Sequence, residues 1–290
     1  MFNQLLTFPD RMEHYFSAGN SIFRRKPDTN GGFDQTETVI SHGVSAFCAY
    51  GDSAGIAHII HTDPDNNLYY SQVQSGQIKT HRLSSIPAEI YPENFRLYSV
   101  GGRLNLLYSA RYQEGYILVH CILGNQAKPH IVAQLDSAHF QIFKGNVYYT
   151  NSQGDVGYTA LADEKPEGFS LLFEKGKNVS VLEADEAELV IYTRDNKLFA
   201  GGNELVYDSR MEMPTLYLSH NKPNVMWKSG GYVRYITLNK DGTPASSPMR
   251  FMASDAEIQT FHTQIADNTR MLYGYNTSYG LHLFGKPDLA

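Results

Sequence analysis

The chain has 290 residues, a formal net charge of −6, 42% hydrophobic residues and 19% charged residues, which is ordinary for a soluble globular protein. The acidic balance argues against a nucleic-acid partner, because such partners bind a basic face. Two cysteines are too few for a disulfide scaffold, and no run approaches the roughly 20 apolar residues of a membrane span, so we expect no membrane partner.

The first predicted elements lie between Phe2 and Ile40, in the runs FNQLLTF, RMEHYFSAGN, SIFRRKPDTNGG and FDQTETVI. Short aromatic-rich runs separated by Gly, Pro, Asn and Asp are typical of strands and turns. Residues 1–16 have no basic n-region, and Pro9, Asp10 and Arg11 interrupt their apolar stretch. We therefore expect no signal peptide and a cytoplasmic protein.

The same four-part order recurs in the segments Ser45–Leu83 and Asn94–Leu135. Each segment contains a first strand, a tight turn, a strand with a prominent aromatic residue, a polar loop, a third strand and an outer strand. The whole chain has 20 Tyr and 15 Phe but a single Trp. This composition and order predict an all-β protein.

An aromatic ring recurs at the same place in each copy of the pattern, about 43 residues apart on average. The ring positions are Phe16, His61, Tyr108, Tyr149, Tyr192, Trp227 and Tyr273. Periods of this length with four strands each are typical of a β-propeller. The spacing favours seven four-stranded blades in one domain, residues 1–290, over six blades with an N-terminal arm.

The ring column has two interpretations. One large ring per blade fills the wedge between neighbouring blades, in which case the rings are buried. Alternatively, the column forms sugar-stacking sites, in which case the rings are open to solvent. We favour the first interpretation.

The run VLEADEAELV, Val181–Val190, has the Ala, Glu and Leu content of a helix. Its place in the repeat is that of a first strand and its turn. We therefore expect a strand, a turn and a second strand here.

Residues Gly51–Gly55 read GDSAG and match the G-x-S-x-G pattern of a hydrolase nucleophile elbow. An elbow requires a strand that turns directly into a helix. The run after Gly55 is a strand by its register with the other copies, so we interpret this segment as a hairpin turn and do not assign Ser53 as a nucleophile.

Other residue types that bear chemistry do not form a recognisable site. His58 and His61 are three residues apart and would point to opposite faces of a strand. Asp63 and Asp65 resemble the start of a calcium loop, but turn chemistry accounts for them and the closing glutamate is missing. We therefore assign no catalytic residues, no metal and no cofactor.

The loops after the second and fourth strands are the best candidates for a ligand site, because in propellers these loops share one face. They include Ile86–Phe95, Ser109–Tyr116, Asp208–Pro214 and Tyr275–Gly280. The candidate ligand-binding residues in or beside these loops are Tyr91, Glu93, Arg111, Tyr112, Arg194, Arg210, Tyr275 and Tyr279.

The runs NLYYSQVQSGQIKTHRL and GGRLNLLYSARYQEGYILVHCIL resemble those of uncharacterised bacterial β-propellers with repeated LYYS-type strands. The resemblance implies a fold and brings no catalytic residues with it. We expect a non-catalytic recognition propeller that binds a protein partner or a glycan. The alternatives are a hydrolase or lyase with its site in the central channel, and a structural module of a larger assembly.

Overall fold

The computed structural model describes residues 3–26, 33–124, 128–161, 168–184, 186–219, 221–253, 258–266, 269–277 and 280–283. The regular elements in these ranges are β-strands, 26 in all. Within the same ranges no helix is long and apolar enough to cross a membrane. The all-β prediction is therefore confirmed.

The chain divides into two compact units, residues 1–134 with 285–290 and residues 135–284. Each unit is described by itself. The prediction of one domain over residues 1–290 stays a prediction.

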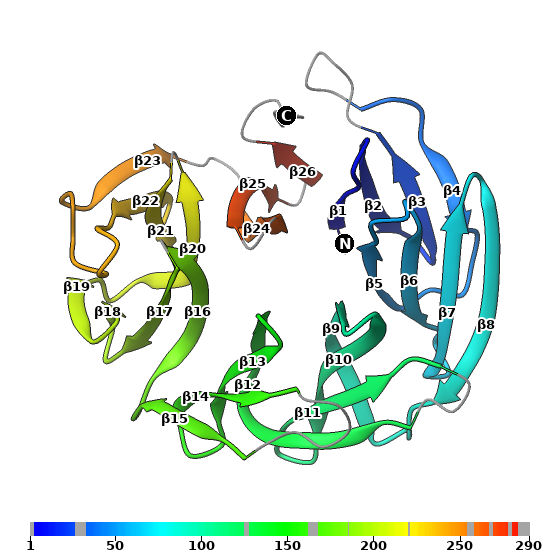
Figure 1. Ribbon diagram of the computed structural model, residues 1–290, viewed down its shortest axis with the longest axis horizontal. Coiled ribbons are helices and arrows are strands. Elements are labelled where there is room, and N and C mark those ends of the chain that lie inside the picture. The colour runs from blue at the N-terminus through cyan, green and yellow to red at the C-terminus, as the bar shows by residue number, and fades with distance from the viewer. Residues whose placement is uncertain are drawn as a thin grey trace. The chain divides into compact units, whose positions relative to one another are not determined.

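The first unit is built from antiparallel meanders in which each strand pairs with the next in the sequence (Figure 1). The first sheet contains β1 (Asn3–Thr7), β2 (Met12–Ala18), β3 (Ser21–Arg25) and β4 (Glu37–Ile40). The second contains β5 (Ala46–Gly51), β6 (Ala57–Thr62), β7 (Asn67–Gln74) and β8 (Gln77–Ser85). The third contains β9 (Ile90–Val100), β10 (Arg103–Tyr112), β11 (Gly115–Ile122) and the start of β12 (His130–Phe143).

The second unit repeats this order. The latter part of β12 pairs with β13 (Asn146–Asn151), which is followed by β14 (Val156–Ala160) and β15 (Ser170–Phe173). The next sheet contains β16 (Lys177–Ala184), β17 (Ala187–Arg194), β18 (Lys197–Ala200) and β19 (Asn203–Tyr207). The last contains β20 (Met211–Ser219), β21 (Lys222–Ser229), β22 (Tyr232–Thr237) and β23 (Met249–Ala253), joined to β24 (Ile258–Ala266), β25 (Thr269–Thr277) and β26 (Gly280–Leu283).

Within Val181–Val190, β16 and β17 pair antiparallel from Val181 with Val190 to Ala184 with Ala187, as the place of the segment in the repeat predicts. Val181 packs into the apolar cluster shared with the preceding sheet, whereas Leu182 packs into the cluster shared with the following one. Both faces of the strand are therefore buried. Burial on two faces outweighs the helix propensity of this composition.

The apolar core lies between neighbouring sheets. One cluster joins the β1–β4 and β5–β8 sheets, and another joins the β5–β8 and β9–β12 sheets. In the second unit, equivalent clusters lie on either side of the β16–β19 sheet. Each sheet with two neighbours in its unit thus presents an apolar face to each of them.

The ring column lies in this core. The rings of His61, Tyr108, Tyr149, Tyr192 and Trp227 are buried, and Phe16 is half-buried. The side chain of Tyr273 lies outside the described part of the structure. The burial that the packing interpretation predicts is confirmed for the five buried rings, which are not open to a sugar, whereas the ring of Phe16 is only half-buried.

Side chains on the first strand of a meander also tie neighbouring sheets together. The Gln141 amide donates to the Val181 carbonyl at 2.6 Å and accepts from the Val181 N–H at 3.0 Å. In the first unit, Gln4 accepts from the Ala49 N–H in the same way. These bonds satisfy backbone groups that the meander leaves unpaired at the free edge of its first strand.

Candidate binding rim

The GDSAG segment is a hairpin turn between β5 and β6, and β6 leaves it as a strand. The Asp52 N–H bonds the Ile56 carbonyl, and the Gly55 N–H bonds the Asp52 carbonyl. The Asp52 carboxylate accepts from the N–H groups of Ala54 and Ile56. Gly55 has φ +78°, which favours glycine. The elbow interpretation of Ser53 is excluded, because no helix follows.

Asp63–Asn67 and Asn151–Asp155 form the same five-residue turn. In each, the first side chain accepts from the N–H groups two and four residues later. The carboxylate of Asp63 also accepts from the Asn67 amide and the Tyr69 hydroxyl. Since its oxygens already bind N–H and O–H donors, Asp63 organises a turn. Among the described residues no group of three or more His, Cys, Asp or Glu side chains is placed to hold a metal ion.

His58 links the Asp52 turn to the β5–β8 sheet. One ring nitrogen lies 2.9 Å from the Asp52 carboxylate, and the other lies 2.6 Å from the Tyr70 hydroxyl. Burial raises the pKa of Tyr70, and the charge of Asp52 adds to this. This hydrogen-bonded series of a carboxylate, a histidine and a hydroxyl resembles a catalytic triad. However, both ring nitrogens of His58 are bound to protein partners. This arrangement holds the turn in place.

The connections between sheets are fastened to the second turns of the meanders. In four places a connection N–H donates to a turn carbonyl at 2.8–3.0 Å. The pairs are Val44 with Asn20, Ile86 with Asn66, Gly176 with Gly154 and Asp208 with Asn196. The loops after second and fourth strands therefore lie at the same end of each of these sheets, as predicted.

The four predicted site residues of the first unit gather at this end of β9 and β10. Tyr91 is the register partner of Arg111, and Glu93 is the extra residue of a β-bulge opposite Ser109 and Ala110. Tyr91, Glu93 and Arg111 are exposed. Tyr112 instead packs against the apolar cluster between the second and third sheets.

Arg111 lies between two tyrosines. It is the register partner of Tyr91 on β9 and of Tyr116 on β11, so the three side chains leave the same face of the sheet. Tyr91 is 60% exposed, Arg111 is exposed and Tyr116 is half-buried. No hydrogen bond or ion pair joins the Arg111 side chain to another described residue. We name Tyr91, Arg111 and Tyr116 the rim row.

Tyr116 was not among the predicted residues. The sequence feature that could have identified Tyr116 is the turn Gln113–Glu114. A two-residue turn after Tyr112 pairs Tyr112 with Gly115, and it therefore pairs Arg111 with Tyr116. The predicted loop Ser109–Tyr116 is thus mostly strand. In a strand, adjacent residues point to opposite faces, which separates Tyr112 from Arg111.

The predicted residues of the second unit differ in setting. Arg194 reaches the Glu174 carbonyl at 3.5 Å, and its guanidinium lies 4.9 Å from the centre of the Phe199 ring. Arg210 is exposed, and its backbone N–H donates to the Asp208 carboxylate at 3.1 Å. The backbone of Tyr275 pairs in β25, but its side chain lies outside the described part, as does all of Tyr279.

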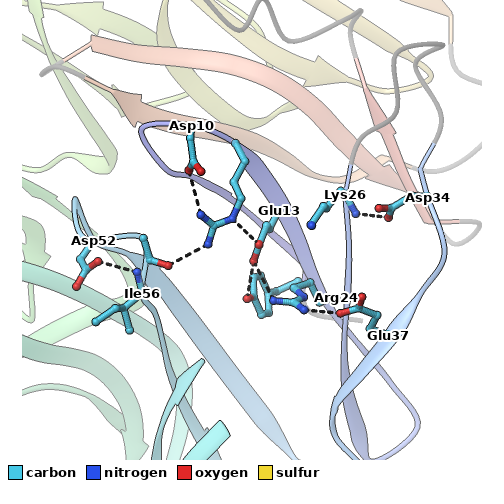
Figure 2. Close-up of polar contacts among 11 residues, drawn as sticks. Asp10, Glu13, Arg24, Lys26, Asp34, Glu37, Asp52 and Ile56 are labelled. Atoms are coloured by element: carbon cyan, nitrogen blue, oxygen red, sulfur yellow. Dashed lines mark hydrogen bonds and ion pairs between the residues drawn. The ribbon is translucent and has the colours of Figure 1, made fainter. Parts of the chain in front are cut away.

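A charged cluster in the first sheet surrounds Glu13, a carboxylate that is 2% exposed (Figure 2). Glu13 accepts from Arg11 at 2.7 Å and from the Tyr15 hydroxyl at 2.8 Å, and it lies 3.6 Å from Arg24. Arg24 also pairs with the exposed Glu37. With burial opposing, the carboxylates raise the pKa of Arg24, so both arginines stay charged. The cluster neutralises its own charge.

Arg11 extends this cluster to the second sheet. Its guanidinium donates to the Gly55 carbonyl at 2.9 Å and pairs with Asp10 at 3.0 Å (Figure 2). It also lies 4.2 Å from the centre of the Phe8 ring. The cluster therefore ties the β5–β6 turn to the first sheet. We assign it a structural role.

No family model matches the chain, and no curated protein sequence matches it. Solved structures do share its fold. BBS1N, solved in complex with ARL6DN, matches with a TM-score of 0.57 and 11% identity over 97% of this chain and 89% of that one. The Dos1 propeller matches with a TM-score of 0.54 and 11% identity over 95% and 76%.

A third match is BamB from Moraxella catarrhalis, with a TM-score of 0.52 and 12% identity over 96% of this chain and 80% of that one. At these identities the matches establish the fold alone. Together with the successive four-stranded meanders, they show that the chain is a β-propeller. The number of blades stays a prediction.

Proposed function

We propose that this propeller is a non-catalytic recognition module that binds a protein partner through the rim row. The observation that carries the proposal is the exposed guanidinium of Arg111 between Tyr91 and Tyr116, without a partner in the described structure. Tyrosine and arginine are enriched in protein interfaces and supply most of their binding hot spots. The row lies on three paired strands, β9, β10 and β11, which restrict the motion of its backbone and so lower the entropic cost of binding.

A glycan is the second candidate ligand, favoured by the open ring of Tyr91, which could serve as a stacking platform. Within the described residues no observation favours a hydrolase, a lyase or a purely structural module. We further propose seven blades in a single domain, membership of the bacterial propellers with LYYS-type repeats, and a cytoplasmic location. The regular ring spacing and the residue patterns support these points.

The proposal is tested by affinity capture, in which this protein is purified and used as the bait for partner proteins. The test variant combines Tyr91→Ala with Arg111→Ala. The control combines Arg103→Ala, at the opposite end of β10, with Tyr207→Ala, an equally exposed ring on β19. We expect one or more proteins to be retained by wild type and control and to bind the test variant at least about tenfold more weakly.

Equal capture by all three proteins, or no specific capture by wild type, would overturn the proposal of a protein partner. A glycan array with the same three proteins tests the second candidate. Binding of a defined glycan that is lost only in the test variant would identify a glycan as a ligand of this row.

A further inference from the structure

A second exposed surface lies away from the rim row, along the outer strand β8. In its sheet β8 pairs with β7, and no further strand of the described residues pairs with it. It has nine residues, whereas the outer strands β4, β15, β19 and β23 have four or five. Residues 77–82 are all exposed. The edge is therefore long and uncovered in the described structure.

The hairpin before β8 determines which of its backbone groups are free. Ser75 and Gly76 have φ of +49° and +80°, as in a two-residue type I′ turn. Gln74 and Gln77 close this turn, and such a closing pair is joined by two backbone N–H to C=O hydrogen bonds. Along an antiparallel ladder, hydrogen-bonded pairs alternate with pairs that are not hydrogen-bonded to each other. Gln77, Lys79 and His81 thus bond to β7. The N–H and C=O groups of Ile78, Thr80 and Arg82 point outward.

The charges along this edge have one sign. β8 carries the cationic side chains of Lys79 and Arg82 together with His81, and it contains no acidic residue, in a chain whose net charge is −6 with histidine counted as neutral. Lys79 and His81 leave one face of the strand, and Ile78, Thr80 and Arg82 leave the other. A strand added beside β8 would place acidic side chains two residues apart opposite Lys79 and His81.

We propose that β8 binds an extended acidic segment of a partner protein, which adds to this sheet as a fifth strand. The free N–H and C=O groups supply the main-chain hydrogen bonds, and the basic residues select acidic side chains. A second copy of this chain fits less well, because pairing two β8 strands would bring like charges together. A charged lysine on an edge strand also disfavours pairing with strands that lack a complementary charge. An acidic segment supplies that charge and can therefore pair with β8.

The test uses a capped nonapeptide of alternating Glu and Val, with a Gln–Val peptide as the uncharged control, and measures binding by fluorescence anisotropy. Thr80→Pro removes one outward N–H and no charge. Thr80→Val is its matched control, because both variants lose the Thr80–Ser71 hydroxyl contact while valine keeps the N–H. Circular dichroism establishes that both variants are folded.

We expect the Glu–Val peptide to bind wild type and Thr80→Val alike, and to bind Thr80→Pro at least about tenfold more weakly. Hydrogen exchange should slow at Ile78, Thr80 and Arg82 when the peptide binds. Equal binding to Thr80→Pro and Thr80→Val would show attraction of any polyanion to the basic side chains and would overturn strand addition. Absence of binding to wild type would overturn it too. The rim-row variant Tyr91→Ala, Arg111→Ala should bind this peptide normally, which separates this proposal from the first.

Discussion

Trp227 donates its indole N–H to the Asp208 carboxylate at 3.0 Å, and both side chains are buried. Asp208 lies in the connection from β19 to β20, and Trp227 lies on β21. The carboxylate also accepts from the Arg210 N–H at 3.1 Å. Burial alone would raise the pKa of Asp208, but hydrogen bonds, that of the indole among them, outweigh it and lower this pKa.

We expect Asp208→Ala to destabilise the protein by about 1–3 kcal/mol, because it leaves a buried indole N–H without an acceptor. Asp208→Asn keeps an acceptor oxygen and should cost less. Urea unfolding followed by fluorescence measures both, since Trp227 is the only tryptophan of the chain. Identical unfolding midpoints for wild type and Asp208→Ala would contradict this role.

The Glu13 cluster gives a second prediction. Glu13→Gln leaves Arg11 and Arg24 without the buried charge between them and should cost roughly 2–3 kcal/mol of unfolding free energy. Glu37 pairs with the same Arg24 but is exposed, so Glu37→Gln should cost less than about 1 kcal/mol. Thermal or urea unfolding of the two variants checks the difference, and equal losses would show that burial of the pair is unimportant.

Two buried histidines predict a pH dependence of stability. Burial lowers the pKa of His61 to about 4, and burial together with the nearby His130 lowers that of His120 to about 4. Between pH 6.5 and 4 the unfolded chain therefore binds more protons than the folded one. Stability should fall as the pH falls through this window, by up to about 1.4 kcal/mol per pH unit for each histidine.

His61→Phe should remove the contribution of His61 to the pH dependence of stability. The unfolding free energy should then change less with pH between pH 6.5 and 4.5. His42→Phe, at an exposed position, is the control. Unfolding midpoints measured at several pH values check both variants. A slope that is unchanged in His61→Phe would refute the contribution of His61.

The repeat made much of the fold predictable. The ring positions fix the register of each meander, and register assigns Gly51–Gly55 to a turn and Val181–Val190 to a hairpin. The hydrophobic residues of Val181–Val190 face two neighbouring cores, so in that segment the pattern of burial reinforces what the spacing indicates. Local motifs and propensities, which suggested an elbow and a helix, carried less information.

The site was less predictable, because it depends on how far strands extend into the rim. β10 continues to Tyr112, and β9 already begins at Ile90, inside the predicted loop Ile86–Phe95. The row of Tyr91, Arg111 and Tyr116 follows from a bulge at Glu93 and a two-residue turn. The residues around Glu13 and Asp208 come together through tertiary contacts that no sequence spacing specifies.

The turn at Asp52 gives the last prediction. Its carboxylate accepts two backbone N–H groups and holds His58, whereas Ser53 is exposed. Asp52→Ala should therefore cost about 1–2 kcal/mol of unfolding free energy, and Ser53→Ala should change it by less than about 0.5 kcal/mol. An activated serine would react with a fluorophosphonate probe, so we expect no labelling of wild type beyond that of Ser53→Ala. Labelling that disappears in Ser53→Ala would restore Ser53 as a nucleophile, because an unactivated turn hydroxyl has no base to take its proton.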